Sequence, residues 1–153
     1  MNIVALLPVT DIVAVAFLRT IAGIEPTRVN TTLPKDDTVV AQGFVQAVSL
    51  GGTPDVHLPW RNPVVTATFW AVNPTSGKPP WGKASQMAEL VRDGCLAHEL
   101  FPKTLNLSSF GDYMDARVHS AYLISEPHRV PFDEGSYARY ESELQLHWTI
   151  IPE

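Results

Sequence analysis

The side chains that could do chemistry in this sequence are scattered. Its five histidines are His57, His98, His119, His128 and His147. None forms an H-x-x-x-H or H-E-x-x-H pair, the spacing that places two metal ligands on one face of a helix. Distant residues could still assemble a zinc or iron site, but isolated core or surface histidines are the simpler interpretation. We therefore expect no catalytic residues, no metal and no cofactor.

Two glutamates of the last predicted strand, Glu141 and Glu143, alternate on one face and could act as a carboxylate pair. The simpler interpretation is that they keep an exposed strand soluble and hinder unwanted pairing. The sequence has no G-x-S-x-G motif, and the glycines at 51–52 precede no helix that could bind a phosphate. A small hydrolase using His119 or His147 with one of these glutamates is the enzymatic alternative, and it requires a deep pocket where they converge.

Two tryptophans lie in loops stiffened by proline. Trp60 and Arg61 belong to the segment LPWR, and Pro80 and Trp81 belong to KPPWGK. A loop tryptophan can cover the core of its own domain. It can also anchor a protein interface, where tryptophan and arginine are enriched and proline lowers the cost of ordering. Trp60, Arg61, Pro80 and Trp81 are therefore the candidate interface residues.

Length and charge limit the class of protein further. With 153 residues, the chain is expected to form one domain over residues 1–153. The net charge is −5, from 16 acidic and 11 basic residues. No basic cluster is present, which argues against binding of nucleic acid through its phosphates and against binding to anionic membranes.

The single cysteine and the first residues add two expectations. Cys95 is the only cysteine, so it can form neither an internal disulfide nor a cysteine-based zinc site alone. The apolar N-terminal run has no Lys or Arg before it, is broken by Pro8 and Asp11, and stops at Arg19. We expect neither an export signal nor a membrane helix, which needs roughly 20 apolar residues.

The hydrophobic pattern predicts an α+β fold. The apolar positions recur at helical spacing in two segments and alternate in others. We expect a mainly antiparallel sheet of about four or more strands flanked by two helices, in the order helix-strand-strand-helix-strand-strand. The first helix is apolar around most of its girth, so it needs burial on more than one side, in its own core or against a neighbouring subunit. The expected elements are a helix at 8–22, strands at 38–48 and 64–72, a helix at 80–100, and strands at 117–126 and 139–150.

Several segments together resemble the tail terminator, or tail completion, proteins of long-tailed bacteriophages (siphoviruses), especially those that infect actinobacteria. The sharpest match is residues 78–92, with KPPWGKA followed by MAELVR. Weaker matches are RVNTTLPK at 28–35, RNPVVTATFWA at 61–71 and LHW at 146–148. The stretch 101–116 has no counterpart.

The resemblance implies a structural virion protein without catalytic residues. The resemblance implies that the chain forms a ring, which we expect to be a hexamer. The ring would cap the head-proximal end of the tail tube, stop its polymerisation and join the tail to the head. The implied partners are other copies of the chain, the tail tube protein and the head–tail connector protein. The genome would pass through the ring without specific binding, and the protein would lie in the host cytoplasm during assembly and then in the virion. The alternative within this class is another head–tail connector or neck protein.

Overall fold

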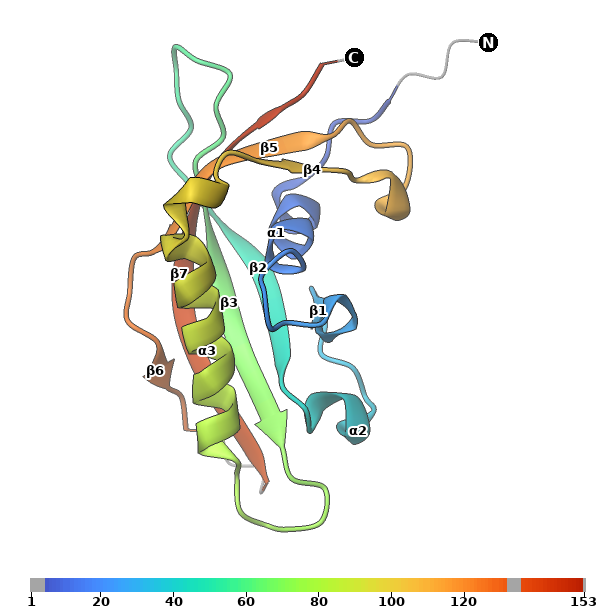
Figure 1. The fold of residues 1–153 in the computed structure, drawn as a ribbon, viewed down its shortest axis with the longest axis vertical. Coiled ribbons are helices and arrows are strands. Elements are labelled where there is room, and N and C mark those ends of the chain that lie inside the picture. The colour runs from blue at the N-terminus through green and yellow to red at the C-terminus, as the bar shows by residue number, and fades with distance from the viewer. Residues whose placement is uncertain (1–4, 132–135, 153) are drawn as a thin grey trace.

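The computed structural model describes residues 5–131 and 136–152; the first four residues of the N-terminal apolar run lie outside them. Its elements are arranged around one curled sheet (Figure 1). The α-helices are α1 (Thr10–Leu18), α2 (Asp37–Val40) and α3 (Trp81–Leu96). The strands are β1 (Val29–Asn30), β2 (Phe44–Gly52), β3 (Pro63–Val72), β4 (Lys103–Leu105), β5 (Ala116–Leu123), β6 (His128–Arg129) and β7 (Tyr137–Ile150). The 3-10 turns are η1 (Pro26–Arg28), η2 (His98–Leu100) and η3 (Ser108–Phe110).

The sheet is built on its three longest strands. The strand order is β1-β2-β3-β7-β5-β4, with β6 also paired to β7. β3 lies between β2 and β7 and is antiparallel to both. Valine, threonine and aromatic residues dominate it, the side chains that suit a pleated and buried surface. The pairing of β1 with β2 is parallel, whereas the other pairings are antiparallel.

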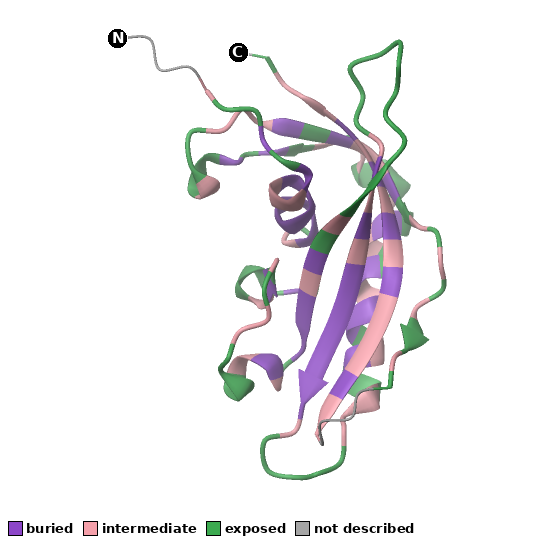
Figure 2. Ribbon diagram, turned by 180° about the vertical axis from the view of Figure 1, so that it is seen from behind, coloured by how far each residue is buried: buried purple, intermediate pink, exposed green. Residues whose placement is uncertain are grey.

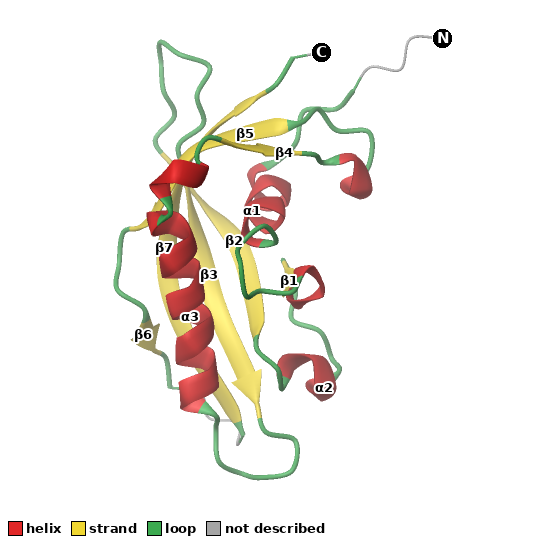
Figure 3. Cartoon of the chain, viewed as in Figure 1, coloured by secondary structure: helices red, strands yellow, loops and turns green. Residues whose placement is uncertain are grey.

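The predicted fold class is wrong. Instead of a mainly antiparallel sheet of about four or more strands flanked by two helices, the structure is a mixed α/β fold with a curled sheet of seven strands and three α-helices among the described residues (Figure 3). The missed strands β1, β4 and β6 have only two or three residues, too few to show a period of two. The curl has a local cause, because the register shifts between Ser49 and Gly51 and between Val118 and Ser120, and such bulges bend a strand.

The strand predicted at 38–48 begins later in the structure than the sequence indicated. Residues 37–40 form the single turn α2, and the strand starts only at Phe44. Asp36 explains the turn, because its carboxylate accepts the backbone N–H of Thr38 at 2.9 Å and caps the helix. Gly43 then adopts a φ of +95°, which interrupts any extended conformation before Phe44.

The first helix is buried inside its own chain. Residues 13–18 are all buried, and α1 contacts β1, β2, β3 and β4. Figure 1 shows how β5 and β4 turn across it, so the sheet covers the helix from more than one side. The apolar side chains around α1 are therefore buried in the core of their own chain, and the helix gives no support to an intersubunit contact.

Asp11, in the first turn of α1, does not cap the helix. The residue before α1 is Val9, which makes no side-chain cap. The Asp11 carboxylate instead accepts the backbone N–H of Ser49 in β2 at 2.7 Å. β1 pairs only with Val45 and Gln46 of β2. Farther along β2, the Asp11 carboxylate accepts a backbone hydrogen bond that a neighbouring strand would otherwise accept.

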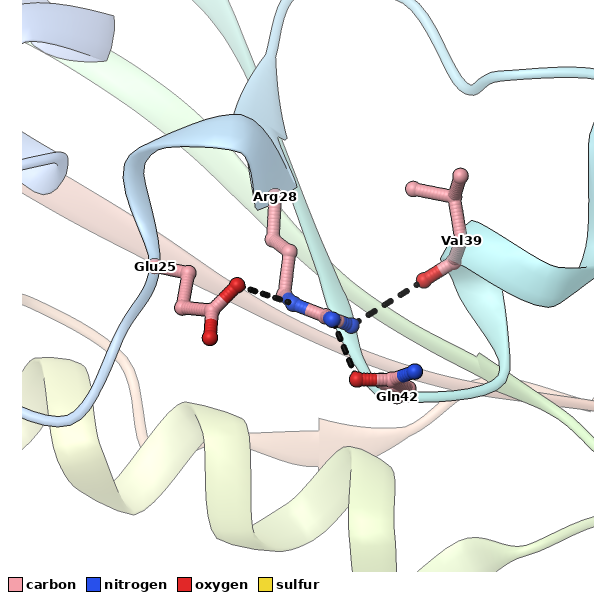
Figure 4. A network of polar contacts seen from close by, with 4 residues as sticks. All are labelled: Glu25, Arg28, Val39 and Gln42. Atoms are coloured by element: carbon pink, nitrogen blue, oxygen red, sulfur yellow. Dashed lines mark hydrogen bonds and ion pairs between the residues drawn. The ribbon is translucent and has the colours of Figure 1, made fainter.

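A partly buried arginine fixes the segment between α1 and β2 (Figure 4). The Arg28 side chain is 14% exposed. Its Nε lies 3.4 Å from Glu25 Oε2, and its Nη1 donates to the carbonyl of Val39 at 3.3 Å. Its Nη2 donates to Gln42 Oε1. One guanidinium thus joins η1 to α2, which makes this long connection an ordered part of the domain.

The core fills the space between the sheet and the two longer helices. α1 and α3 lie on the same face of the sheet (Figures 1 and 2). The buried side chains of β7 come from one parity of the strand, including Ser142, Leu144, Leu146 and Trp148. No described helix combines the length and the hydropathy needed to cross a membrane.

Two glycines of α3 offer a matched test of this packing. A Cβ at Gly94 would lie 2.9 Å from two carbons of the buried Ile21, whereas a Cβ at Gly82 would meet nothing within 4 Å. We expect Gly94→Ala to lower the free energy of unfolding by about 1–2 kcal/mol, because overpacking outweighs the better helix propensity of alanine. Gly82→Ala should raise it by about 0.5 kcal/mol. Urea unfolding followed by circular dichroism measures both, and equal effects would contradict the packing.

Candidate functional site

The predicted interface residues Trp60 and Arg61 close the hairpin loop 53–62 between β2 and β3. The Trp60 ring stacks on the imidazole of His119, with centroids 5.1 Å apart and planes 7° apart, and it is 41% exposed. Arg61 exchanges two backbone hydrogen bonds with Trp148, at 2.8 and 2.9 Å, and its guanidinium lies 5.1 Å from the Trp148 ring centroid. These two residues fix the base of the hairpin to β5 and β7.

The other two predicted interface residues lie at the opposite end of the molecule. Pro80 precedes α3, and Trp81 is its first residue. The half-buried Trp81 ring meets Tyr140 of β7 edge-on at 6.2 Å, and the guanidinium of Arg129 in β6 lies 4.1 Å from its centroid. Trp81 therefore joins the start of α3 to β6 and β7, and the structure does not bring it together with Trp60.

Removal of the Trp81 ring is a test of this intramolecular role. We expect Trp81→Ala to lower the free energy of unfolding by about 2 kcal/mol, because half-buried aromatic area and a cation–π contact are both lost. Trp81→Phe should lose less, since it keeps a ring against Tyr140. Urea midpoints measure both variants. A folded Trp81→Ala protein that fails to assemble would instead support the anchoring role of Trp81 in an interface.

Two of the five histidines lie close together on the open face of the sheet. His119 Nε2 is 2.9 Å from Thr149 Oγ1. His147 Nδ1 is 2.7 Å from Asn62 Oδ1, and its Nε2 is 3.4 Å from the Tyr122 hydroxyl. These partners are neutral hydroxyl and amide groups, which orient the two imidazole rings.

The carboxylates of the enzymatic alternative lie elsewhere on β7. Glu141 forms an ion pair with Arg139 at 2.9 Å, and Glu143 is held through its backbone N–H by the Ser125 hydroxyl at 3.0 Å. None of the cavities that we describe, which have volumes of about 290 to 370 Å³, is lined by His119 or His147. No group of three metal-ligating side chains occurs among the described residues. The convergence that a hydrolase requires is therefore not found in the described part of the chain.

The environment of His119 gives a pH dependence. Burial lowers the pKa of His119 from its ordinary value of 6.5, and the charges of Arg117 and His147 lower it further. The unfolded chain then binds a proton more readily than the folded chain, so stability is complete above about pH 6.5 and is lost as the pH falls through the lowered pKa. We expect the urea midpoint to drop below pH 6.5, and to drop less in His119→Gln. An equal drop in both proteins would assign the effect to other groups.

Apart from Trp60, the exposed apolar side chains are the feature that sequence reasoning missed. They come from the N-terminal segment, the end of β2, the hairpin loop, the end of α3 and the end of β5. Figures 1 and 2 show that these segments lie in the same half of the molecule, the upper half in both views. The opposite end, with α2, loop 73–80 and β6, contributes no large exposed apolar side chain among the described residues. The exposed residues are Leu6, Leu7, Val9, Val48, Leu50, Val56, Leu58, Trp60, Leu96, Leu100, Tyr122 and Ile124.

The hairpin carries the most prominent of these side chains. Val56 is 87% exposed and Leu58 is 53% exposed. Both were visible in the sequence as apolar residues inside a loop that contains Pro54 and Pro59, which is an unusual place for them when no partner is present. We name the twelve exposed side chains together the apolar end.

Comparisons with known proteins add no relative to this description. No protein-family model matches the sequence, and no curated protein shows significant similarity to it. The resemblance to tail terminators therefore rests on the sequence segments at 28–35, 61–71, 78–92 and 146–148.

Proposed function

We propose that this protein is a structural subunit of a phage virion, a tail terminator that forms a hexameric ring on the head-proximal end of the tail tube. The ring stops the polymerisation of the tube and joins the tail to the head–tail connector. The observation that supports the proposal best is the apolar end, because all the large exposed apolar side chains of the described residues come from segments in one half of the molecule. The hexamer and the phage partners come from the sequence resemblance.

The apolar end supports assembly for an energetic reason. Single exposed apolar residues are ordinary on monomers, but a gathering of them at one place is typical of a surface that contacts another protein. Burial of apolar surface contributes about 25 cal/mol for each Å² removed from water. A side chain such as Val56 can therefore contribute to assembly, since it is largely exposed in the single subunit.

The charge of the chain fits a channel for DNA. The net charge is −5, and a ring of acidic subunits presents no basic cluster that would hold passing phosphates. The same charge keeps separate subunits soluble before assembly. The partners in the proposal are other copies of the chain, the tail tube protein and the connector protein.

Assembly with the tail tube subunit from the same genome tests the proposal. The tube subunit is allowed to polymerise alone, with this protein, or with an unrelated acidic protein of similar size, and tube lengths are measured by electron microscopy. We expect short tubes with a ring at one end only when this protein is present. Tubes of unchanged length without rings would refute the proposed function.

A further inference from the structure

We propose that the hairpin tip, residues 55–58, of one subunit docks into the cavity beside the carboxyl end of α3 on a second copy of the chain. This inference rests on the proposed function, since it names the surfaces that join neighbouring subunits of the ring. Three observations support it: the tip is ordered, the cavity has an apolar wall, and the polar side chains beside that wall are complementary to those of the tip.

The hairpin tip is formed in advance of any contact. The Asp55 carboxylate accepts the backbone N–H groups of His57 at 2.8 Å and of Leu58 at 2.9 Å. These two hydrogen bonds, with that from Leu58 the larger cause, lower the pKa of Asp55, so the tip carries a negative charge at neutral pH. Val56 lies between Asp55 and His57 in the sequence, and its side chain is 87% exposed. A tip that is already ordered loses little conformational entropy on binding.

The cavity lies between the end of α3 and the connection from β5 to β6. Its volume is about 320 Å³, which is the liquid volume of about ten water molecules. Leu96, Tyr122 and Ile124 contribute its apolar wall, and each of these side chains is about half exposed. The wall therefore loses contact with water if an apolar tip enters the cavity.

The polar side chains that line the cavity are complementary to those of the tip. The cavity is also lined by Arg92 and Glu126, so one positively charged and one negatively charged side chain accompany its apolar wall. On the tip, Asp55 precedes Val56 and His57 follows it. Asp55 can pair with Arg92, and the imidazole of His57 can donate a hydrogen bond to Glu126. This complementarity is the reason for choosing a second copy of the chain as the occupant.

Arg92 is available for such a contact. Its nearest acidic partner is Glu89, at 3.8 Å, and both side chains are about half exposed. Exposed pairs of this kind contribute little to stability. Exchange of Glu89 for Asp55 of a neighbour therefore costs little.

The positions of the tip and the cavity determine the type of assembly. Figure 1 shows the hairpin projecting beyond the sheet, away from the end of α3 and the connection to β6. The two surfaces are different parts of the chain, so each subunit can offer its tip to one neighbour and its cavity to the other. Such head-to-tail contacts close into a ring when the rotation between subunits allows it.

Cysteine cross-linking on tubes tests the contact. Both target positions, Val56 and Ile124, are exposed, so substitution there should not disturb folding. The native Cys95 is buried, and burial raises the pKa of its thiol to about 12, so it gives little background reaction. Proteins with Val56→Cys and Ile124→Cys are mixed with the tail tube subunit, oxidised gently, and separated on a non-reducing gel.

We expect the mixture to give disulfide-linked dimers, and the double variant Val56→Cys/Ile124→Cys to give a ladder of more than two chains. The control pairs Ile124→Cys with Thr75→Cys, which lies in loop 73–80 at the opposite end, and should give at least tenfold less product. Rings on tubes without the Val56–Ile124 cross-link would overturn this inference and leave the proposed function intact. A ladder that stops at two chains, or an equally reactive control pair, would also overturn it. Absence of any assembly with tubes would refute the proposed function and this contact with it.

Discussion

Replacement of Trp148 by alanine is expected to lower the free energy of unfolding by about 3–5 kcal/mol, the range found for large aromatic residues removed from a core. Trp148 is fully buried, and its ring lies beneath the guanidinium of Arg61. The substitution leaves a cavity where β7 meets β5 and the base of the hairpin. Unfolding in urea, followed by circular dichroism, measures the loss as a lower midpoint.

Trp148→Phe is the matched control for this prediction. The indole Nε1–H of Trp148 is buried and has no acceptor within hydrogen-bonding distance among the described residues. An unsatisfied buried donor costs about 1–3 kcal/mol, so its removal offsets part of the lost volume. We expect Trp148→Phe to change the free energy of unfolding by less than about 1.5 kcal/mol. A loss as large as that of the alanine variant would mean that the indole nitrogen has an important partner.

The double variant Val56→Ser/Leu58→Ser is expected to abolish ring assembly without unfolding the subunit. Both side chains are largely exposed, so the change in unfolding free energy should stay within about 0.5 kcal/mol. A hot-spot residue of an interface costs about 2 kcal/mol or more when it is truncated. The proposed contact gives this role to the hairpin tip, so removal of both side chains should weaken association by at least about 100-fold. Native mass spectrometry and the lengths of tubes in electron micrographs measure the loss.

A control for the hairpin variant comes from the opposite end of the molecule. Thr75 and Lys78 lie in the exposed loop between β3 and α3, outside the apolar end. Thr75→Ser/Lys78→Ser makes the same number of changes and should leave both stability and assembly unchanged. If Val56→Ser/Leu58→Ser assembles as well as this control, the hairpin is not part of a subunit contact.

The long elements of the fold could be predicted from the sequence because their periodicity extends over many residues. The apolar positions Met87, Val91 and Cys95 of α3 recur at helical spacing and are buried, and the alternate residues of β7 are buried as well. The sheet could not be predicted in full, because β1, β4 and β6 are short and are fixed by their neighbours. Local capping also overrode strand propensity at Thr38–Val40, where Asp36 stabilises a helical turn.

The candidate surface was less predictable than the fold. The sequence drew attention to Trp60 and Trp81 through their residue type, but it could not show that Trp81 packs on Tyr140 and Arg129 of its own chain. The gathering of exposed apolar residues depends on the topology, which brings Leu6, Val56 and Leu96 to one end from distant positions in the sequence. No local pattern contains that information. Val56 and Leu58 alone carried a local signal, as apolar residues in a loop of turn-forming residues.

The hydrogen bond between Asp11 and Ser49 has a consequence for how copies of this chain behave at high concentration. A bare strand margin is a template on which further chains can stack by their backbones, and this leads to amyloid-like aggregates. A carboxylate that already occupies an amide of β2 makes such stacking unfavourable, because an incoming strand would have to displace a charged acceptor. Contacts between copies are then selected by their side chains, which can specify a finite particle, whereas backbone pairing alone sets no limit to growth.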